Sequence, residues 1–264
     1  MGAEGRGKGD GNVNVLADTF AWFTDPANYS GANSIPLRVM EHVQLSAQPV
    51  FLAALLALPV GLYVGHKRRF EFAAISVGNI GRAVPSFGLI AFLFVPTFAW
   101  PGVLGYWAVF IAMTLLAIPP ILINTSVGIR SVDRDTVEAA RGMGMSEWDV
   151  LLRIEVPLAV PLIVAGLKTA SVQVIATATL GAITSIGGLG RFIIDGMAAG
   201  RDDIVLGGAI LVALLAILTE VTFSLLEGVL SPRTSSGHRR WFRRTDSESG
   251  PPDTQTGPAG LGVA

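Results

Sequence analysis

Residue types that commonly carry chemistry are sparse in this 264-residue sequence. Cysteine is absent, which excludes disulfides and thiolate metal sites. The three histidines, His42, His66 and His238, are far apart and lack the spacing of metal ligands. No nucleophile is paired with a base, and no G-x-x-x-x-G-K-[ST] phosphate loop occurs. The sequence therefore predicts a chain without a catalytic centre, a metal site or a nucleotide site of its own.

One polar stretch, residues 130–161, has a pattern suited to binding a partner. It reads RSVDRDTVEAARGMGMSEWDVLLRIEVPLAVP. Asp133 or Asp135 can cap a helix that begins near Thr136. Gly142 and Gly144 are expected to end this helix. The positions expected on its apolar face are Val137, Ala140 and Met143 or Gly144.

A second short helix is expected over Ser146–Ile154, ended by Pro157 and Pro161. The residues expected on its apolar face are Trp148, Leu151, Leu152 and Val156. A short helix on a glycine hinge suits docking into a groove of a soluble partner. We expect Ala139 and Ala140 to permit close approach, and Glu138 and Arg141 to pair with charges of that partner.

The remainder of the chain is apolar enough to hold this loop between membrane spans. Hydrophobic residues make up 51% of the sequence and charged residues 15%, and the mean hydropathy is +0.56. About 20 apolar residues cross a bilayer as a helix. Five such segments are expected, at about Val43–Val64, Phe72–Val95, Val103–Ile123, Pro161–Ile183 and Ile204–Leu230.

The distribution of basic residues orients these spans. Lysine and arginine gather after the first, third and fifth segments, within residues 67–69, 130–153 and 233–244. Loops rich in basic residues remain in the cytoplasm. We therefore expect the N-terminus outside and the C-terminus inside, with the 130–160 loop in the cytoplasm.

The two ends of the chain are expected to flank one transmembrane domain, residues 43–230. Residues 1–42 form an extracytoplasmic segment, whose aromatic part, 15–29, is either an interfacial helix or a partly ordered tail. Residues 231–264 are expected to be a disordered cytoplasmic tail. Its basic cluster, residues 239–244, either contacts anionic lipid or remains a solvated anchor.

The polar loop resembles the signature of ABC importer permeases. That signature is Glu-Ala-Ala, three residues, Gly, nine residues, Ile, one residue and Leu-Pro. Every spacing fits here, and the one departure is Val156 in place of leucine. The resemblance implies that the following residues dock the ATPase: Glu138, Ala139, Ala140, Arg141, Gly142, Gly144, Ile154 and Pro157.

Three shorter segments resemble osmoprotectant permeases, which transport glycine betaine, carnitine or choline. They are Ala83-Val84-Pro85-Ser86, Thr177-Ala178-Thr179-Leu180 and Gly187-Gly188-Leu189-Gly190. The resemblance covers roughly residues 43–230. It implies an all-α, polytopic protein of the type I, MetI-like permease fold in the bacterial inner membrane.

The resemblance also implies the partners. Two copies of an ATP-binding subunit would hydrolyse ATP with Mg, and this chain would be no enzyme and bind no cofactor. A second permease, identical or paralogous, would complete the pathway, and an extracytoplasmic binding protein would deliver the solute. Membrane lipid surrounds the spans, and no nucleic acid is expected.

Polar residues within the spans are candidates for the translocation path. They are Arg82, Ser86, Lys168, Thr169, Gln173, Thr177 and Thr179. Each has a structural alternative. Arg82 could pair with carbonyl groups or with Glu220, Lys168 could extend to the interface, and the hydroxyl groups could bond to their own helix.

The sequence leaves other functions open. The same architecture serves ABC permeases for amino acids or other small solutes. A secondary transporter or channel would work without ATP, but such proteins often contain inverted repeats, and none is detectable here. A membrane scaffold without transport is the fourth possibility. Trp100, Tyr106 and Trp107 are read as interface aromatics, which leaves any aromatic cage for a quaternary amine to the binding protein.

Overall fold

A computed structural model of the chain describes residues 11–68, 76, 85–95, 104–184 and 186–230. These residues are nearly all helical, and no strand occurs among them, which confirms the all-α prediction. The elements are α1 (Gly11–Thr24), η1 (Pro26–Tyr29), α2 (Ile35–Lys67), α4 (Ser86–Phe94), α5 (Leu104–Arg130), α6 (Arg134–Gly142), α7 (Glu147–Val150), the π-helical turn η3 (Leu151–Glu155), α8 (Val156–Ala178), η4 (Thr179–Thr184), α9 (Gly190–Ala199) and α10 (Asp202–Leu230).

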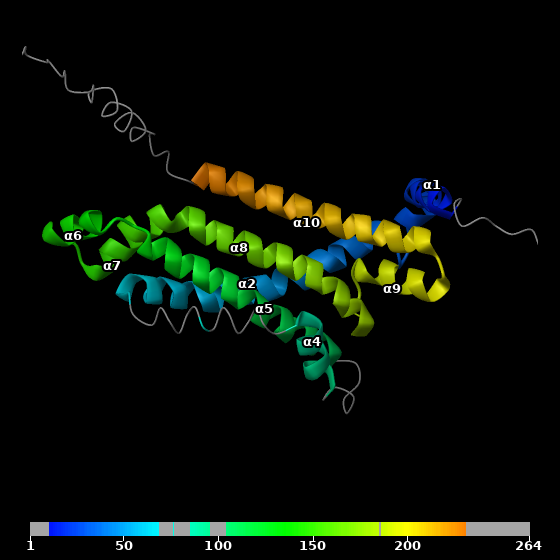
Figure 1. The fold of residues 1–264 in the computed structure, drawn as a ribbon, viewed down its shortest axis with the longest axis horizontal. Helices are drawn as coiled ribbons and strands as arrows, with labels where there is room; N and C mark the ends of the chain where they lie inside the picture. Colours follow the sequence, from blue (N-terminus) through cyan, green and yellow to red (C-terminus); the bar gives the residue numbers. More distant parts are fainter. Residues whose placement is uncertain (1–10, 69–75, 77–84, 96–103, 185, 231–264) are drawn as a thin grey trace, which may run out of the picture. The chain divides into compact units, whose positions relative to one another are not determined.

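Four helical stretches in the described part of the chain are long and apolar enough to cross a membrane. They are 35–67, 105–130, 147–184 and 202–230. Figure 1 shows them side by side, with α6 and α7 at one end of the bundle and α1 and α9 at the other. We call these the loop end and the clamp end. The expected span at 72–95 falls mostly outside the described residues, which include only Ser76, Pro85, α4 and Val95 of it.

The helices extend beyond the apolar segments that predict them. The first spanning helix begins at Ile35 rather than near Val43. Its additional turns contain Arg38, Glu41 and His42. The side chains of these polar residues form hydrogen bonds within the protein, so the segment remains helical. Similarly, α5 continues past Ile123 to Arg130.

The prolines after the loop do not end a helix, contrary to expectation. Helical structure continues from Glu147 through α7, η3 and α8 to Thr184. Pro157 occupies the first turn of α8, where a missing N–H costs little, and the wide π turn precedes it. Pro161 lies inside α8. One continuous helical rod therefore connects the loop end to the clamp end.

The core lies where α5 packs against α2 and α8. Ala53 and Ala57 of α2 meet Ala112 and Met113 of α5, all of them buried. A side chain at Gly61 would collide with Thr125 of α5. Small residues allow this close approach of helix backbones, the common device for packing helices within a membrane.

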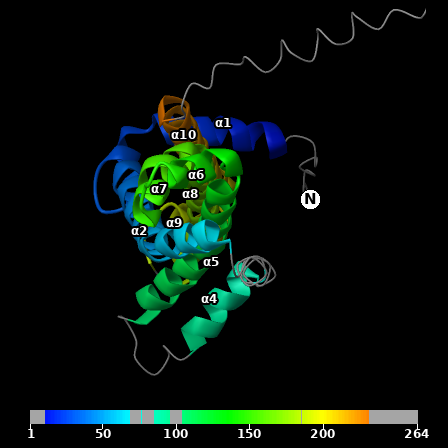
Figure 2. The ribbon, with the colours of Figure 1, turned by 90° about the vertical axis from the view of Figure 1, so that its left-hand side faces the viewer.

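The N-terminal aromatic stretch forms an ordered helix. α1 lies crosswise against α10 (Figure 2), and the ring of Trp22 occupies the notch left by Gly207. Trp22 is 7% exposed and makes an edge contact with Phe192 of α9, with ring centroids 5.2 Å apart. Residues 11–24 are thus helical, and the location of this helix at the membrane interface stays a prediction.

Candidate functional site

The loop end of the bundle contains α6, whose boundaries follow from its caps. Asp133, not Asp135, is the N-cap, and its carboxylate accepts hydrogen bonds from Thr136 N at 3.2 Å and Thr136 Oγ1 at 3.0 Å. The helix ends at Gly142, and the chain then turns at Gly144, whose φ is +86°. Only glycine adopts this conformation without strain.

The inner face of α6 forms a small core of its own. Val137 and Ala140 are buried against Val132 and Val150. Ala140 therefore packs inside the loop, and of the Glu-Ala-Ala triplet only Glu138 and Ala139 are exposed.

The outer surface of this loop is more apolar than expected. Met143 is 78% exposed and Trp148 is 72% exposed, and Leu152 is also exposed. In η3, Leu151 and Glu155 are the buried residues. The loop therefore presents an apolar surface that nothing in the described chain covers.

Arg141 forms its ion pair within the loop. Its Nε lies 2.9 Å from Glu147 Oε1 and its Nη2 lies 3.1 Å from Glu147 Oε2. This bidentate pair joins α6 to α7, so Arg141 already has a partner in its own chain. Ile154 is half-buried against the small core, and Pro157 is exposed.

A polar cluster that sequence reasoning missed ties α2 to this loop. His66 Nδ1 lies 2.5 Å from Glu155 Oε2, and His66 Nε2 lies 2.9 Å from Glu147 Oε2. His66 and Glu155 are both buried. The cluster borders a cleft of about 890 Å³ that is also lined by Lys67 and Arg134. A signal existed in the sequence, because Glu155 is a lone carboxylate between Ile154 and Val156.

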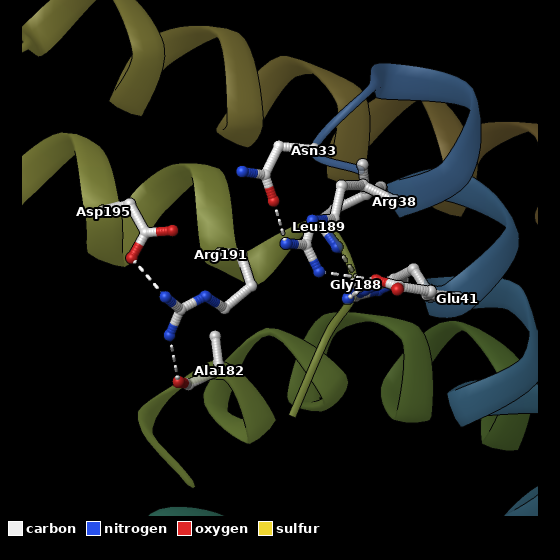
Figure 3. Close-up of polar contacts among 9 residues, drawn as sticks. Asn33, Arg38, Glu41, Ala182, Gly188, Leu189, Arg191 and Asp195 are labelled. Carbon is white, nitrogen blue, oxygen red and sulfur yellow. Dashed lines mark hydrogen bonds and ion pairs between the residues drawn. The ribbon is translucent and has the colours of Figure 1, made fainter. Parts of the chain in front are cut away.

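The clamp end contains a second polar cluster, where α2 holds the segment after η4 (Figure 3). Glu41 Oε2 accepts from Gly188 N at 2.8 Å and from Arg38 Nη1 at 2.8 Å. His42 Nδ1 accepts from Leu189 N at 3.2 Å, so Nε2 carries the ring proton and donates to Ile175 O at 3.0 Å. His42 is completely buried. We call these contacts the clamp.

At two positions of the Gly187–Gly190 segment, the backbone conformation or the available space in the clamp requires glycine. Gly188 has a φ of +89°, and a side chain at Gly190 would collide with the backbone oxygen of Thr179. Beyond the segment, Arg191 of α9 pairs with Asp195 at 2.7 Å (Figure 3).

The candidate path residues on α8 have local partners. Lys168 Nζ lies 3.4 Å from Glu227 Oε2 and 3.4 Å from Ser224 Oγ, which links α8 to α10. The hydroxyl groups of Thr169, Thr177 and Thr179 donate to carbonyl oxygens of their own helical segment. The structure therefore supports the local-bonding alternative for these hydroxyls, although Thr169 is also exposed.

The remaining path candidates are Arg82, Ser86 and Gln173. Arg82 lies outside the described residues. Ser86 begins α4 and is half-buried. Gln173 is half-buried on α8. Their role in a path stays a prediction.

Comparison with known proteins identifies the family. Residues 57–236 match the model of the "Binding-protein-dependent transport system inner membrane component" family. This chain belongs to that family. Its members are membrane components of transport systems, so the four long apolar helices are membrane spans in the inner membrane.

Individual permeases of this family are similar over most of their length. The chain is 34% identical to the carnitine transport permease protein OpuCB of Listeria monocytogenes, covering 76% of this chain and 90% of that protein. It is 32% identical to the glycine betaine/carnitine/choline transport system permease protein OpuCB of Bacillus subtilis, covering 75% and 88%. These relatives are transport permeases, in agreement with a non-enzymatic subunit.

Solved structures agree on the fold. An inward-facing structure of the MetNI methionine ABC transporter has a TM-score of 0.63, covers 74% of this chain and 95% of its own, and is 19% identical. At that identity the likeness shows the permease fold alone. It confirms the predicted MetI-like, type I architecture for the spans that the structure describes.

Proposed function

We propose that this permease is the transmembrane subunit of an ATP-driven importer for a quaternary ammonium compatible solute, such as glycine betaine, carnitine or choline. The observation that carries the proposal is the similarity to permeases named for these solutes, at 32–34% identity over 88–90% of their length. A charge-bearing, methylated amine is the chemistry that these solutes share.

We further propose how the complete transporter is assembled. Two ATP-binding subunits hydrolyse ATP with Mg and dock on the loop end, which faces the cytoplasm. A second permease, identical or paralogous, completes the pathway, and an extracytoplasmic binding protein delivers the solute to the clamp end. Residues 43–230 form the transmembrane domain, and residues 1–42 and 231–264 flank it outside and inside.

The contacts within the chain support a route for the coupling. In this proposal the ATPase grips the exposed surface formed by Glu138, Ala139 and Trp148. Movement of the loop then reaches α2 through the His66–Glu155 contact. The continuous rod from Glu147 to Thr184 carries the same movement toward the clamp, because Ile175 on that rod bonds to His42.

The test is reconstitution of the permease with its ATPase, second permease and binding protein in proteoliposomes. We expect glycine betaine, choline or carnitine to stimulate ATP hydrolysis and uptake. Stimulation by amino acids alone would support the alternative substrate class. A solved amino acid ABC transporter has a similar fold, with a TM-score of 0.56 and 16% identity. Uptake without any ATPase subunit would indicate a secondary transporter and defeat the proposal.

A further inference from the structure

Glu220 of α10 lies at the depth of the lipid hydrocarbon. α10 has 29 residues, and at a rise of about 1.5 Å per residue Glu220 is about 6 Å from the middle of the helix. The hydrocarbon core is about 30 Å thick, so a spanning α10 holds this carboxyl group well inside it.

In the described part of the chain, Glu220 makes no hydrogen bond or ion pair, and its side chain is exposed. Glu227, two turns further along α10, differs because it pairs with Lys168. A carboxylate that faces lipid at mid-membrane is strongly disfavoured. Such residues therefore face a partner or a water-filled cavity.

The direction of Glu220 follows from its neighbours on α10. Leu215, Thr219 and Phe223 line an apolar groove between α2, α8 and α10. Glu220 is turned by about 100° from Thr219, since a helix has about 3.6 residues per turn. Glu220 and Ser224 belong to one row and are both exposed.

α8 borders the same row. Lys168 reaches Ser224 and Glu227 across the contact between the two helices. One residue further around α8, Thr169 is exposed. This face of the α8–α10 pair therefore combines hydroxyl groups with a carboxyl group that has no partner among the described residues, whereas the outermost surface of α10 is apolar, with exposed Leu218 and Leu225.

We propose that Glu220 lines the solute pathway where this face meets the second permease subunit, and that its carboxylate stabilises the positive charge of the solute. The inference rests on the proposed function, because it takes a quaternary ammonium group as the ligand. A quaternary nitrogen has no proton to donate, so a nearby negative charge or an aromatic face must stabilise it. A single carboxylate on a polar wall provides that charge without a closed cage.

The first test measures which residues of α10 face water. The chain has no natural cysteine, so each single-cysteine variant carries one thiol in this subunit, and the unsubstituted transporter gives the background reaction of the other subunits. We expect Glu220→Cys and Ser224→Cys to react with the trimethylammonium-ethyl methanethiosulfonate reagent more than about tenfold faster than the lipid-facing controls Leu218→Cys and Leu225→Cys, because a thiolate is disfavoured in hydrocarbon. Choline should slow the reaction of Ser224→Cys, which keeps Glu220. No reaction at Glu220, or equal rates at all four positions, would overturn the inference.

The second test measures transport by Glu220→Gln. We expect choline uptake to fall by about tenfold or more, the effect of losing one interaction with a charged group, without loss of assembly or thermal stability. Glu220→Asp should recover part of the rate. Thr222→Val, on another side of α10, is the matched control and should transport normally.

The outcomes separate this inference from the proposed function. A wild-type transporter that moves no quaternary ammonium solute defeats the proposed function, whereas cysteine mapping still shows whether Glu220 faces water. Normal uptake by Glu220→Gln overturns the role of Glu220 alone. Recovery of that variant by Arg82→Gln would assign Glu220 to an ion pair with Arg82 and overturn the role in the pathway.

Discussion

His66 Nδ1 and Glu155 Oε2 lie 2.5 Å apart, although 89 residues separate them in the chain. The contact joins the end of α2 to the π-helical turn that directly precedes α8. Both side chains are buried, at the edge of the cleft that Lys67 and Arg134 also line.

We expect Glu155→Leu to destabilise the permease by about 3–5 kcal/mol, the cost of removing one member of a buried pair. Thermal unfolding of the purified protein in detergent measures this effect. The double variant His66→Leu with Glu155→Leu should recover much of the loss, and the exposed Glu138→Gln should leave the unfolding midpoint unchanged. Additive losses in the double variant would show that the two residues are not coupled.

Gly144 and Gly142 provide a matched pair in the docking loop. Gly144→Ala should cost about 1–2 kcal/mol because its φ of +86° is strained for any side chain, and Gly144→Asp should abolish solute-stimulated ATPase activity while membrane insertion stays normal. Gly142→Ala adds a methyl group in open space at the end of a helix and should be tolerated. Full transport by Gly144→Asp would contradict the assignment of the docking loop.

The clamp should control hydrogen exchange at its backbone amides. His42→Leu removes the acceptor of Leu189 N and the donor to Ile175 O, and each unsatisfied buried group costs about 1–3 kcal/mol. We expect exchange of the Leu189 amide to become about tenfold faster or more. Met40→Leu, an exposed neighbour on α2, serves as the control. Unchanged protection of Leu189 in His42→Leu would mean that the clamp does not hold this segment.

A substitution at Trp148 should weaken docking of the ATPase without affecting the stability of the permease. Its side chain is 72% exposed, so Trp148→Ala should leave the unfolding temperature unchanged. Aromatic residues at the centre of an interface commonly contribute about 2 kcal/mol or more, so binding of the ATPase should weaken by about 30-fold. Leu16→Ala, on α1 at the other end of the bundle, should bind normally. Equal binding by both variants, measured by co-purification, would exclude Trp148 from the docking surface.

The predictable parts of this structure depend on local signals. Long apolar runs identify the spans, and Asp133 or Asp135 before Thr136 indicates the start of α6. The turn at Gly144 follows from a residue type that allows a positive φ. Each of these features involves neighbours in the chain, which is why the helix and its end could be located without the structure, whereas the choice of Asp133 as the cap needed it.

The unpredictable parts depend on distant partners. The clamp joins His42 to Leu189, 147 residues apart, and no periodicity encodes such a pair. The same limit explains why α2 begins earlier than its apolar run, since polar residues remain helical when a distant segment bonds to them.

The contact of Trp22 with Gly207 constrains the order in which the protein can be completed. Thr19 Oγ1 also donates to Asp203 O, across 184 residues of sequence. α1 is synthesised before α10, yet it packs against the beginning of α10. These contacts therefore form only after residues 202–207 have been synthesised. In a nascent chain stopped before Asp202, neither Thr19 nor Trp22 would have its partner on α10.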